Sequence, residues 1–141
     1  MVVDMHVTAY LNFDGRCEEA FRFYERCLGG KIEVMMTFGE SPMAGELAAQ
    51  SGSKILHASM TVKGMWLMGG DVPDGRYEKP QGFAVMLGMS DAAEAERVFG
   101  ELAEGGAVTL GLQETFWAAR FGMVTDRFGT PWMVNCAGAA G

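Results

Sequence analysis

Residues 20–30 read Ala-Phe-Arg-Phe-Tyr-Glu-Arg-Cys-Leu-Gly-Gly, and this stretch has the residue spacing of an amphipathic helix. Its apolar residues recur every three or four positions, which places them in one stripe: Ala20, Phe23, Tyr24, Cys27 and Leu28. The pair Gly29-Gly30 predicts the helix end, because glycine readily adopts the left-handed conformation of a C-cap. Residues 20–28 are therefore predicted to form a helix that packs one face against a core.

The same pattern occurs again 75 positions later in the chain. Residues 95–106 read Ala-Glu-Arg-Val-Phe-Gly-Glu-Leu-Ala-Glu-Gly-Gly, and their apolar residues repeat the spacing of the first stripe. Asp91 is suited to cap the start of this second helix, and Gly105-Gly106 is suited to end it. The chain is therefore predicted to contain two copies of one structural unit.

Extended segments surround both predicted helices in the same order. The predicted strands cover residues 7–13, 32–37, 55–62 and 65–68 in the first half and 83–89, 108–112, 119–125 and 132–136 in the second. Each half therefore has the order β-α-β-β-β. We predict one α+β domain over residues 1–141, with module one at about 5–71 and module two at about 82–136, joined through the turn-rich segment 70–82.

A cleft follows from this arrangement on physical grounds. A four-stranded sheet with one helix on one face leaves its other face uncovered. Two such halves can turn their open faces toward each other. The predicted fold is therefore a pair of tandem βαβββ modules whose mixed sheets curl around a cleft.

Composition excludes several classes of partner. The 141 residues carry a net charge of −7, which argues against nucleic acid and favours a neutral or cationic ligand. No apolar run approaches the roughly 20 residues that cross a bilayer, so no membrane partner is expected.

The three cysteines are an odd number, and Cys17 and Cys27 lie too far apart on one helix to form a disulfide. We therefore expect a reduced, cytoplasmic protein.

Three further segments resemble one branch of a known superfamily. They are 11–15 (Leu-Asn-Phe-Asp-Gly), 114–123 (Glu-Thr-Phe-Trp-Ala-Ala-Arg-Phe-Gly-Met) and 126–135 (Asp-Arg-Phe-Gly-Thr-Pro-Trp-Met-Val-Asn). With the first helix motif they resemble the PhnB-like branch, often labelled 3-demethylubiquinone methyltransferase-like, of the glyoxalase/bleomycin-resistance/dioxygenase (vicinal oxygen chelate) superfamily. The resemblance covers roughly residues 5–136 and implies the tandem βαβββ fold and a homodimer, in which subunits sometimes exchange halves. The methyltransferase label has no support in the sequence, which lacks a glycine-rich strand–loop–helix for a nucleoside cofactor.

The resemblance also implies where a metal would bind. Enzymes of this superfamily typically hold a divalent metal through four His, Gln or Glu side chains on the first and last strands of each half. Aligned on the helix motifs and hairpin turns, those positions are Thr8, Met68, Ala84 and Met133. None of these residues, nor their immediate neighbours, is a usual ligand. We therefore expect no family-type metal and no cofactor, and a site built from His6 and His57 with Glu40 or Glu114 stays an open alternative.

His57 is the candidate catalytic and ligand-binding residue. On its strand Leu56, Ala58 and their alternate neighbours form an apolar face, and His57 lies on the other, mixed face. If the mixed face points into the cleft, a histidine there can act as a base or a hydrogen-bond donor near neutral pH. A structural histidine that bonds a backbone carbonyl is the alternative. His6 shares a face with Tyr10 on the first strand, and exposure is expected for it.

Aromatic and methionine residues are the other candidates for the ligand site. Trp117 and Phe116 are expected at the edge of the cleft, with Tyr10, Met68 and Met133 on strands, because such residues form adaptable apolar pockets. Most individual aromatic residues are nevertheless expected in the core. Glu114 and Arg120 could pair with each other, orient a ligand or form a structural ion pair.

The sequence leaves open two functions from different classes. The first is a metal-independent protein that binds a small, planar or cationic organic molecule in the cleft, without transforming it. The alternative is an enzyme of the same superfamily, of the lyase, isomerase or dioxygenase type, with an unrecognised catalytic or metal site.

Overall fold

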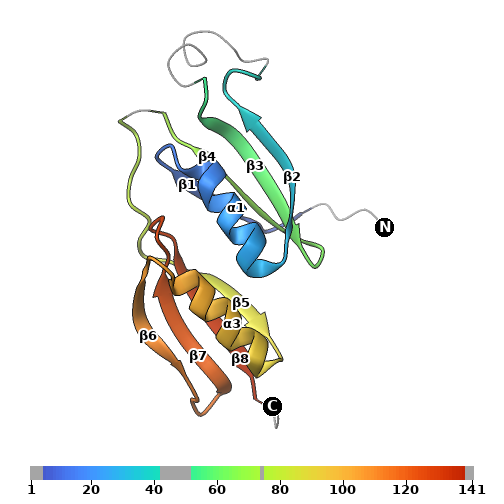
Figure 1. Cartoon of the computed structure of the whole chain (residues 1–141), viewed down its shortest axis with the longest axis vertical. Coiled ribbons are helices and arrows are strands. Elements are labelled where there is room, and N and C mark those ends of the chain that lie inside the picture. The colour runs from blue at the N-terminus through green and yellow to red at the C-terminus, as the bar shows by residue number, and fades with distance from the viewer. Residues whose placement is uncertain (1–4, 42–51, 74, 139–141) are drawn as a thin grey trace. The chain divides into compact units, whose positions relative to one another are not determined.

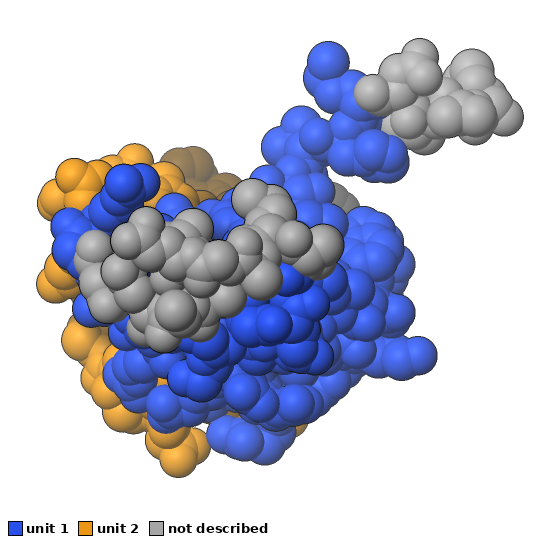
Figure 2. Space-filling model, turned by 90° about the horizontal axis from the view of Figure 1, so that it is seen from above, with its two compact units in different colours: residues 1–77 blue, residues 78–141 orange. Residues whose placement is uncertain are grey.

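The protein divides into two compact units. The structure is a computed structural model that describes residues 5–41, 52–73 and 75–138. Unit 1 comprises residues 1–77 and unit 2 residues 78–141, coloured separately in Figure 2. The predicted modules 5–71 and 82–136 each fall within one unit, and whether they make up a single domain stays a prediction.

Unit 1 has one helix packed on a four-stranded sheet (Figure 1). Its elements are β1 (Ala9–Phe13), α1 (Cys17–Leu28), β2 (Lys31–Thr37), β3 (Ile55–Val62) and β4 (Met65–Asp71). The strand order is β1-β4-β3-β2, with β1 parallel to β4 and the other neighbours antiparallel. The helix between β1 and β2 allows β1 to pair in parallel with the last strand of its own module.

Unit 2 repeats this topology. Its elements are β5 (Val85–Met89), α3 (Ala92–Ala103), β6 (Ala107–Gln113), β7 (Ala118–Thr125) and β8 (Pro131–Ala137). The strand order is β5-β8-β7-β6, again with one parallel pair, β5 with β8. The prediction of an α+β fold built from two βαβββ modules is therefore confirmed, while the cleft stays a prediction.

The two helices begin and end close to where their stripes predict. Gly29 has a left-handed backbone (φ 68°) and ends α1, and the Asp91 side chain accepts a hydrogen bond from the Glu94 amide at the start of α3. The end of α3 differs in detail, because Glu104 is the C-cap in an extended conformation and the left-handed glycine, Gly105, follows it. None of the described helices has the length and hydrophobicity needed to cross a bilayer.

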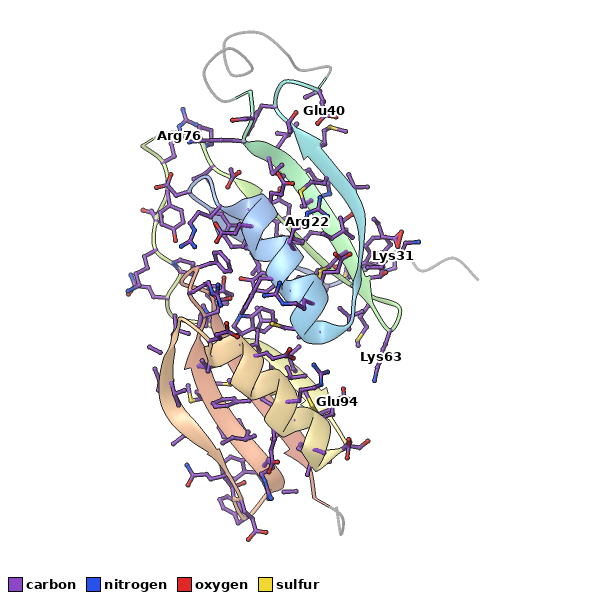
Figure 3. The ribbon with its side chains drawn as sticks, in the orientation of Figure 1. Arg22, Lys31, Glu40, Lys63, Arg76 and Glu94 are labelled. Atoms are coloured by element: carbon purple, nitrogen blue, oxygen red, sulfur yellow. The ribbon has the colours of Figure 1, made fainter. Side chains whose placement is uncertain are left out.

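Strand glycines allow the helices to lie close to their sheets. A Cβ atom at Gly69 in β4 would lie 2.8 Å from the Phe21 ring of α1, and one at Gly122 in β7 would lie 2.7 Å from the Phe99 ring of α3. Both glycines therefore face a helix, and the neighbouring strand residues point away from it. Charged side chains such as Arg22 on α1 and Glu94 on α3 are labelled in Figure 3.

Candidate functional site

The first candidate surface is the face of the unit 1 sheet opposite α1. Gly69 and its register partner Ala58 face the helix, so Met68 and His57 lie on the opposite face. Tyr10 is the register partner of Met68 on β1 and shares that face. We call this set of Tyr10, His57 and Met68 the β1–β4–β3 surface.

Tyr10 and His57 form a stacked pair on this surface. Their ring centroids lie 5.8 Å apart with 21° between the ring planes, and the Tyr10 hydroxyl donates a 3.4 Å hydrogen bond to the Leu56 carbonyl. Tyr10 is 47% exposed and His57 is partly exposed, so solvent reaches both residues. A flat, accessible pair with a hydroxyl and an imidazole at its edges can stack a planar ring and orient its polar groups.

Gly70 makes this stacking possible. The residue lies on β4, between the strands that carry Tyr10 and His57. A Cβ atom there would lie 2.8 Å from the Tyr10 hydroxyl oxygen and 2.6 Å from the Leu56 carbonyl oxygen. The Tyr10 ring therefore crosses the β4 backbone where no side chain blocks it. Sequence reasoning missed this residue because its role appears only once the strand register is known.

The Tyr10 hydroxyl remains protonated in the folded protein at neutral and mildly alkaline pH. Burial raises the pKa of Tyr10 above its ordinary value. The hydroxyl therefore keeps its hydrogen bond to the Leu56 carbonyl over this pH range, and its oxygen can accept a hydrogen bond from a ligand.

The second candidate surface is the helix-free face of the unit 2 sheet. Met133 on β8 lies there, because its neighbour Val134 pairs with Gly122, which faces α3. Met133 has Met86 of β5 and Met123 of β7 as its register partners on either side. Sequence reasoning proposed Met133 as a ligand-site residue, and the shared row becomes visible only through the register.

The aromatic residues predicted at a site edge cluster at one end of β7. Phe116 and Trp117 lie between β6 and β7 and pack edge to face, with ring centroids 4.8 Å apart. Trp117 also packs on Phe121 at 5.3 Å. Phe116 is 97% exposed, and Trp117 is 52% exposed. The two residues are thus accessible to a ligand, and their role in binding stays a prediction.

Arg120 and Glu114 do not pair with each other in the part of the chain that the structure describes. Arg120 Nε lies 3.2 Å from Glu96 Oε1 on α3, and an Arg120 guanidinium nitrogen also donates to the Ala119 carbonyl at 2.7 Å. This is the structural ion pair that the sequence left open, with a different partner. Glu114 is exposed beside the Phe116–Trp117 turn.

The residues at the family metal positions do not fit a divalent metal. Met68 and Met133 carry thioethers, Ala84 has no ligand atom, and Thr8 offers only a neutral hydroxyl. Within residues 5–41, 52–73 and 75–138, no group of three His, Cys, Asp or Glu side chains could hold a metal ion. His6 is exposed, as expected, and is not brought together with His57 in such a group.

Comparison with known proteins identifies the family. The family model described as 3-demethylubiquinone-9 3-methyltransferase matches residues 5–135. The chain belongs to this family. Protein YjdN of Escherichia coli strain K12 is 34% identical over 139 residues, which cover 93% of this chain and 95% of that protein.

Solved structures show that the fold of this family member also occurs in other proteins. Protein PA1353 from Pseudomonas aeruginosa is 45% identical and superposes with a TM-score of 0.87, over 95% of this chain and 98% of that chain. A glyoxylase/bleomycin resistance protein/dioxygenase domain from Frankia sp. EAN1pec is 15% identical with a TM-score of 0.63, over 98% and 99% of the two chains. The predicted branch, labelled 3-demethylubiquinone methyltransferase-like, is therefore confirmed by the family model, whereas at 15% identity the likeness to the Frankia domain shows a shared fold alone.

Proposed function

We propose that this family member binds a small, planar organic molecule on the β1–β4–β3 surface, without a divalent metal. The observation that supports the proposal most is the solvent-accessible stack of Tyr10 on His57. A third aromatic ring added to such a pair gains about 0.5–1.5 kcal/mol beyond the area that it buries. Met68 beside Tyr10 supplies a polarizable, adaptable contact.

The charge of the protein supports a cationic or neutral ligand over an anionic one. The net charge of −7 attracts cations to the surface at low ionic strength. The Tyr10 hydroxyl and the His57 imidazole can each form a hydrogen bond with a polar edge of the ligand. These groups fix the orientation of a ligand whose flat face rests on the ring pair.

Methyl transfer receives little support despite the family's descriptive label. The two strand-to-helix connections among the described residues are Asp14-Gly15-Arg16 before α1 and Ser90-Asp91 before α3. Neither has the series of glycines that brings a backbone close to a nucleoside cofactor. We also infer a cytoplasmic homodimer, and the three buried cysteine thiols support the reducing location.

The binding proposal can be tested with planar probes of opposite charge. Fluorescence titration with the acridine cation proflavine and with the anion 9-anthracenecarboxylate measures affinity and charge preference. We expect proflavine to bind more tightly, and Tyr10→Ala to weaken its binding by about tenfold, because the stack and its contact area are lost. Phe83→Ala removes an aromatic residue that is 52% exposed in unit 2 and should bind proflavine as the wild type does.

Equal proflavine affinity in Tyr10→Ala and the wild type would show that the probe binds elsewhere and would contradict the proposal. Absence of binding by both probes at millimolar concentration would contradict it as well. Thermal unfolding of each variant shows whether a lost affinity reflects a lost fold.

An enzymatic role for His57 is the second candidate. The imidazole lies beside a protonated phenol on an accessible surface, so the two groups can act as base and acid on a stacked substrate. If a turnover is found, His57→Ala should abolish it while the urea midpoint of unfolding stays close to that of the wild type. Full turnover by the His57→Ala variant would exclude this role.

A further inference from the structure

Three methionines form one row across the unit 2 sheet. Met133 of β8 is the register partner of Met86 on β5 and of Met123 on β7. The three therefore lie side by side on three hydrogen-bonded strands, and all point away from α3. We call this set the methionine row.

The spacing of the row suits a shared ligand. Neighbouring strands lie about 4.8 Å apart, and side chains of directly opposed residues start about 4.5–5.5 Å from each other. A methionine side chain has three rotatable bonds between its backbone and its methyl group. The two outer sulfur atoms can therefore swing toward the central one without any change in the backbone.

The row is accessible and is not required by the fold. Met86 is 61% exposed, and Met123 and Met133 are partly exposed. The corresponding row of unit 1 is Tyr10, Met68 and Ser59, paired in the same way on β1, β4 and β3. The same topology thus forms with a phenol and a hydroxyl at the outer positions, so three thioethers are a property of this chain's second module.

Thioether chemistry selects one class of ion. A neutral, polarizable sulfur is a soft ligand that favours Cu(I), whereas Zn²⁺, Mn²⁺ and Mg²⁺ prefer imidazole, thiolate or oxygen ligands. We propose that the methionine row binds one soft monovalent cation, Cu(I) or its air-stable counterpart Ag(I), through the three sulfur atoms. The inference concerns unit 2 and does not depend on the ligand proposed for the β1–β4–β3 surface.

The test uses the full-length protein labelled with ¹³C at its methionine methyl groups and titrated with silver nitrate in chloride-free buffer. We expect the Met86, Met123 and Met133 methyl resonances to shift together and to saturate at one equivalent of Ag(I). Met133→Leu keeps the shape of the side chain and removes the central sulfur. This substitution should weaken Ag(I) binding by at least about tenfold, since even changes outside the first ligand shell cost about 10–100-fold.

Met65→Leu is the matched control, because Met65 is 66% exposed on β4 and pairs with Val62 rather than with another methionine. Its affinity for Ag(I) should equal that of the wild type. Unshifted methyl resonances of the row, or equal affinity in Met133→Leu and the wild type, would overturn the proposal. Ag(I) binding to the thiols of the three cysteines, with the methyl resonances of the row unshifted, would also overturn the proposal.

Discussion

At the scale of single residues, Cys17 in the first turn of α1 has a thiol whose pKa is raised well above its ordinary value. The residue is fully buried, and burial raises the pKa of its thiol; the negative charges of Asp71 and Glu18 raise it further. The thiol therefore stays protonated in the folded protein at pH values where it ionises in the unfolded chain. A thiol held in this way is a poor nucleophile, which agrees with a structural role for Cys17.

This raised pKa predicts a loss of stability at alkaline pH. Below about pH 8.5 the thiol is protonated in both states, and above it only the unfolded chain releases the proton. The free energy of unfolding should then fall by up to about 1.4 kcal/mol per pH unit through this group. Urea unfolding of the wild type and Cys17→Ala between pH 7 and 10 measures the effect, because the alanine variant lacks the titrating group. The difference in stability between the two proteins should shrink above pH 8.5, and parallel curves would contradict the prediction.

Single residues were predictable from the sequence where only their own strand mattered. Alternation along β3 was enough to place His57 and Ala58 on opposite faces of the sheet. The helical stripe was enough to predict that Cys27 is buried. The stack of Tyr10 on His57 was not predictable, because β1 and β3 come together only through β4 between them. The alternation also fails at Leu56, where a bulge against β2 allows Ile55 to be buried.

At the scale of elements, one carboxylate joins three segments of module one. Asp71, the last residue of β4, is buried and accepts hydrogen bonds from the amides of Gly15 and Cys17 at the start of α1 (2.8 and 3.0 Å) and of Ile55 at the start of β3 (2.8 Å). Arg16, the N-cap of α1, makes no capping bond with its own side chain. Asp71 therefore caps the helix from a distant part of the sequence.

Removal of this charge should destabilise module one. Asp71→Asn keeps the size of the side chain but replaces one acceptor oxygen with a donor that faces a backbone amide. We expect a loss of about 2–4 kcal/mol in the free energy of unfolding, since buried hydrogen bonds to charged groups contribute about 1.5–3 kcal/mol each. Asp14→Asn, at an exposed position of the same connection, should cost a few tenths of a kcal/mol. Equal urea midpoints for the two variants would show that Asp71 is not the cap.

Elements were predicted well where the periodicity was strong. Both helices and all eight described strands lie where the sequence placed them, with ends that differ by a few residues. β4 extends to Asp71, beyond the predicted end at Met68, because Gly69 and Gly70 pair normally with β1. Glycine has a low strand propensity, so these residues weaken the prediction of a strand from sequence. Here they are required, because Phe21 and Tyr10 come close to the β4 backbone at these two positions.

At the scale of the whole molecule, the residues at the metal positions predict independence from divalent metals. Thr8, Met68, Ala84 and Met133 offer no carboxylate or imidazole to such an ion. Dialysis against EDTA should therefore leave the Tm unchanged within about 1 °C, since no bound ion contributes to stability. Calcium-saturated EDTA is the control for effects of the chelator itself. A Tm that falls by several degrees with free EDTA and is restored by one equivalent of Zn²⁺, Ni²⁺ or Mn²⁺ would contradict this prediction.

The tandem fold itself was predictable at this scale because the two helix motifs repeat at a fixed distance and the strands around them follow the same order. The use of each sheet was less predictable. The helix-facing sides of the two sheets share glycines and small residues at the contact, whereas the open sides carry a phenol and an imidazole in one module and thioethers in the other. Both proposed sites use the sheet face that helix packing leaves unconstrained, whereas the periodicity of the sequence describes the packed face.

Every strand pair among the described residues joins strands of the same module. The backbone hydrogen bonding of the first sheet is therefore complete as soon as β4 has been synthesised, before any strand of the second module exists. On the ribosome the N-terminal module can fold while the C-terminal module is still being translated. A folding error in the second module therefore need not prevent the first from reaching its native structure.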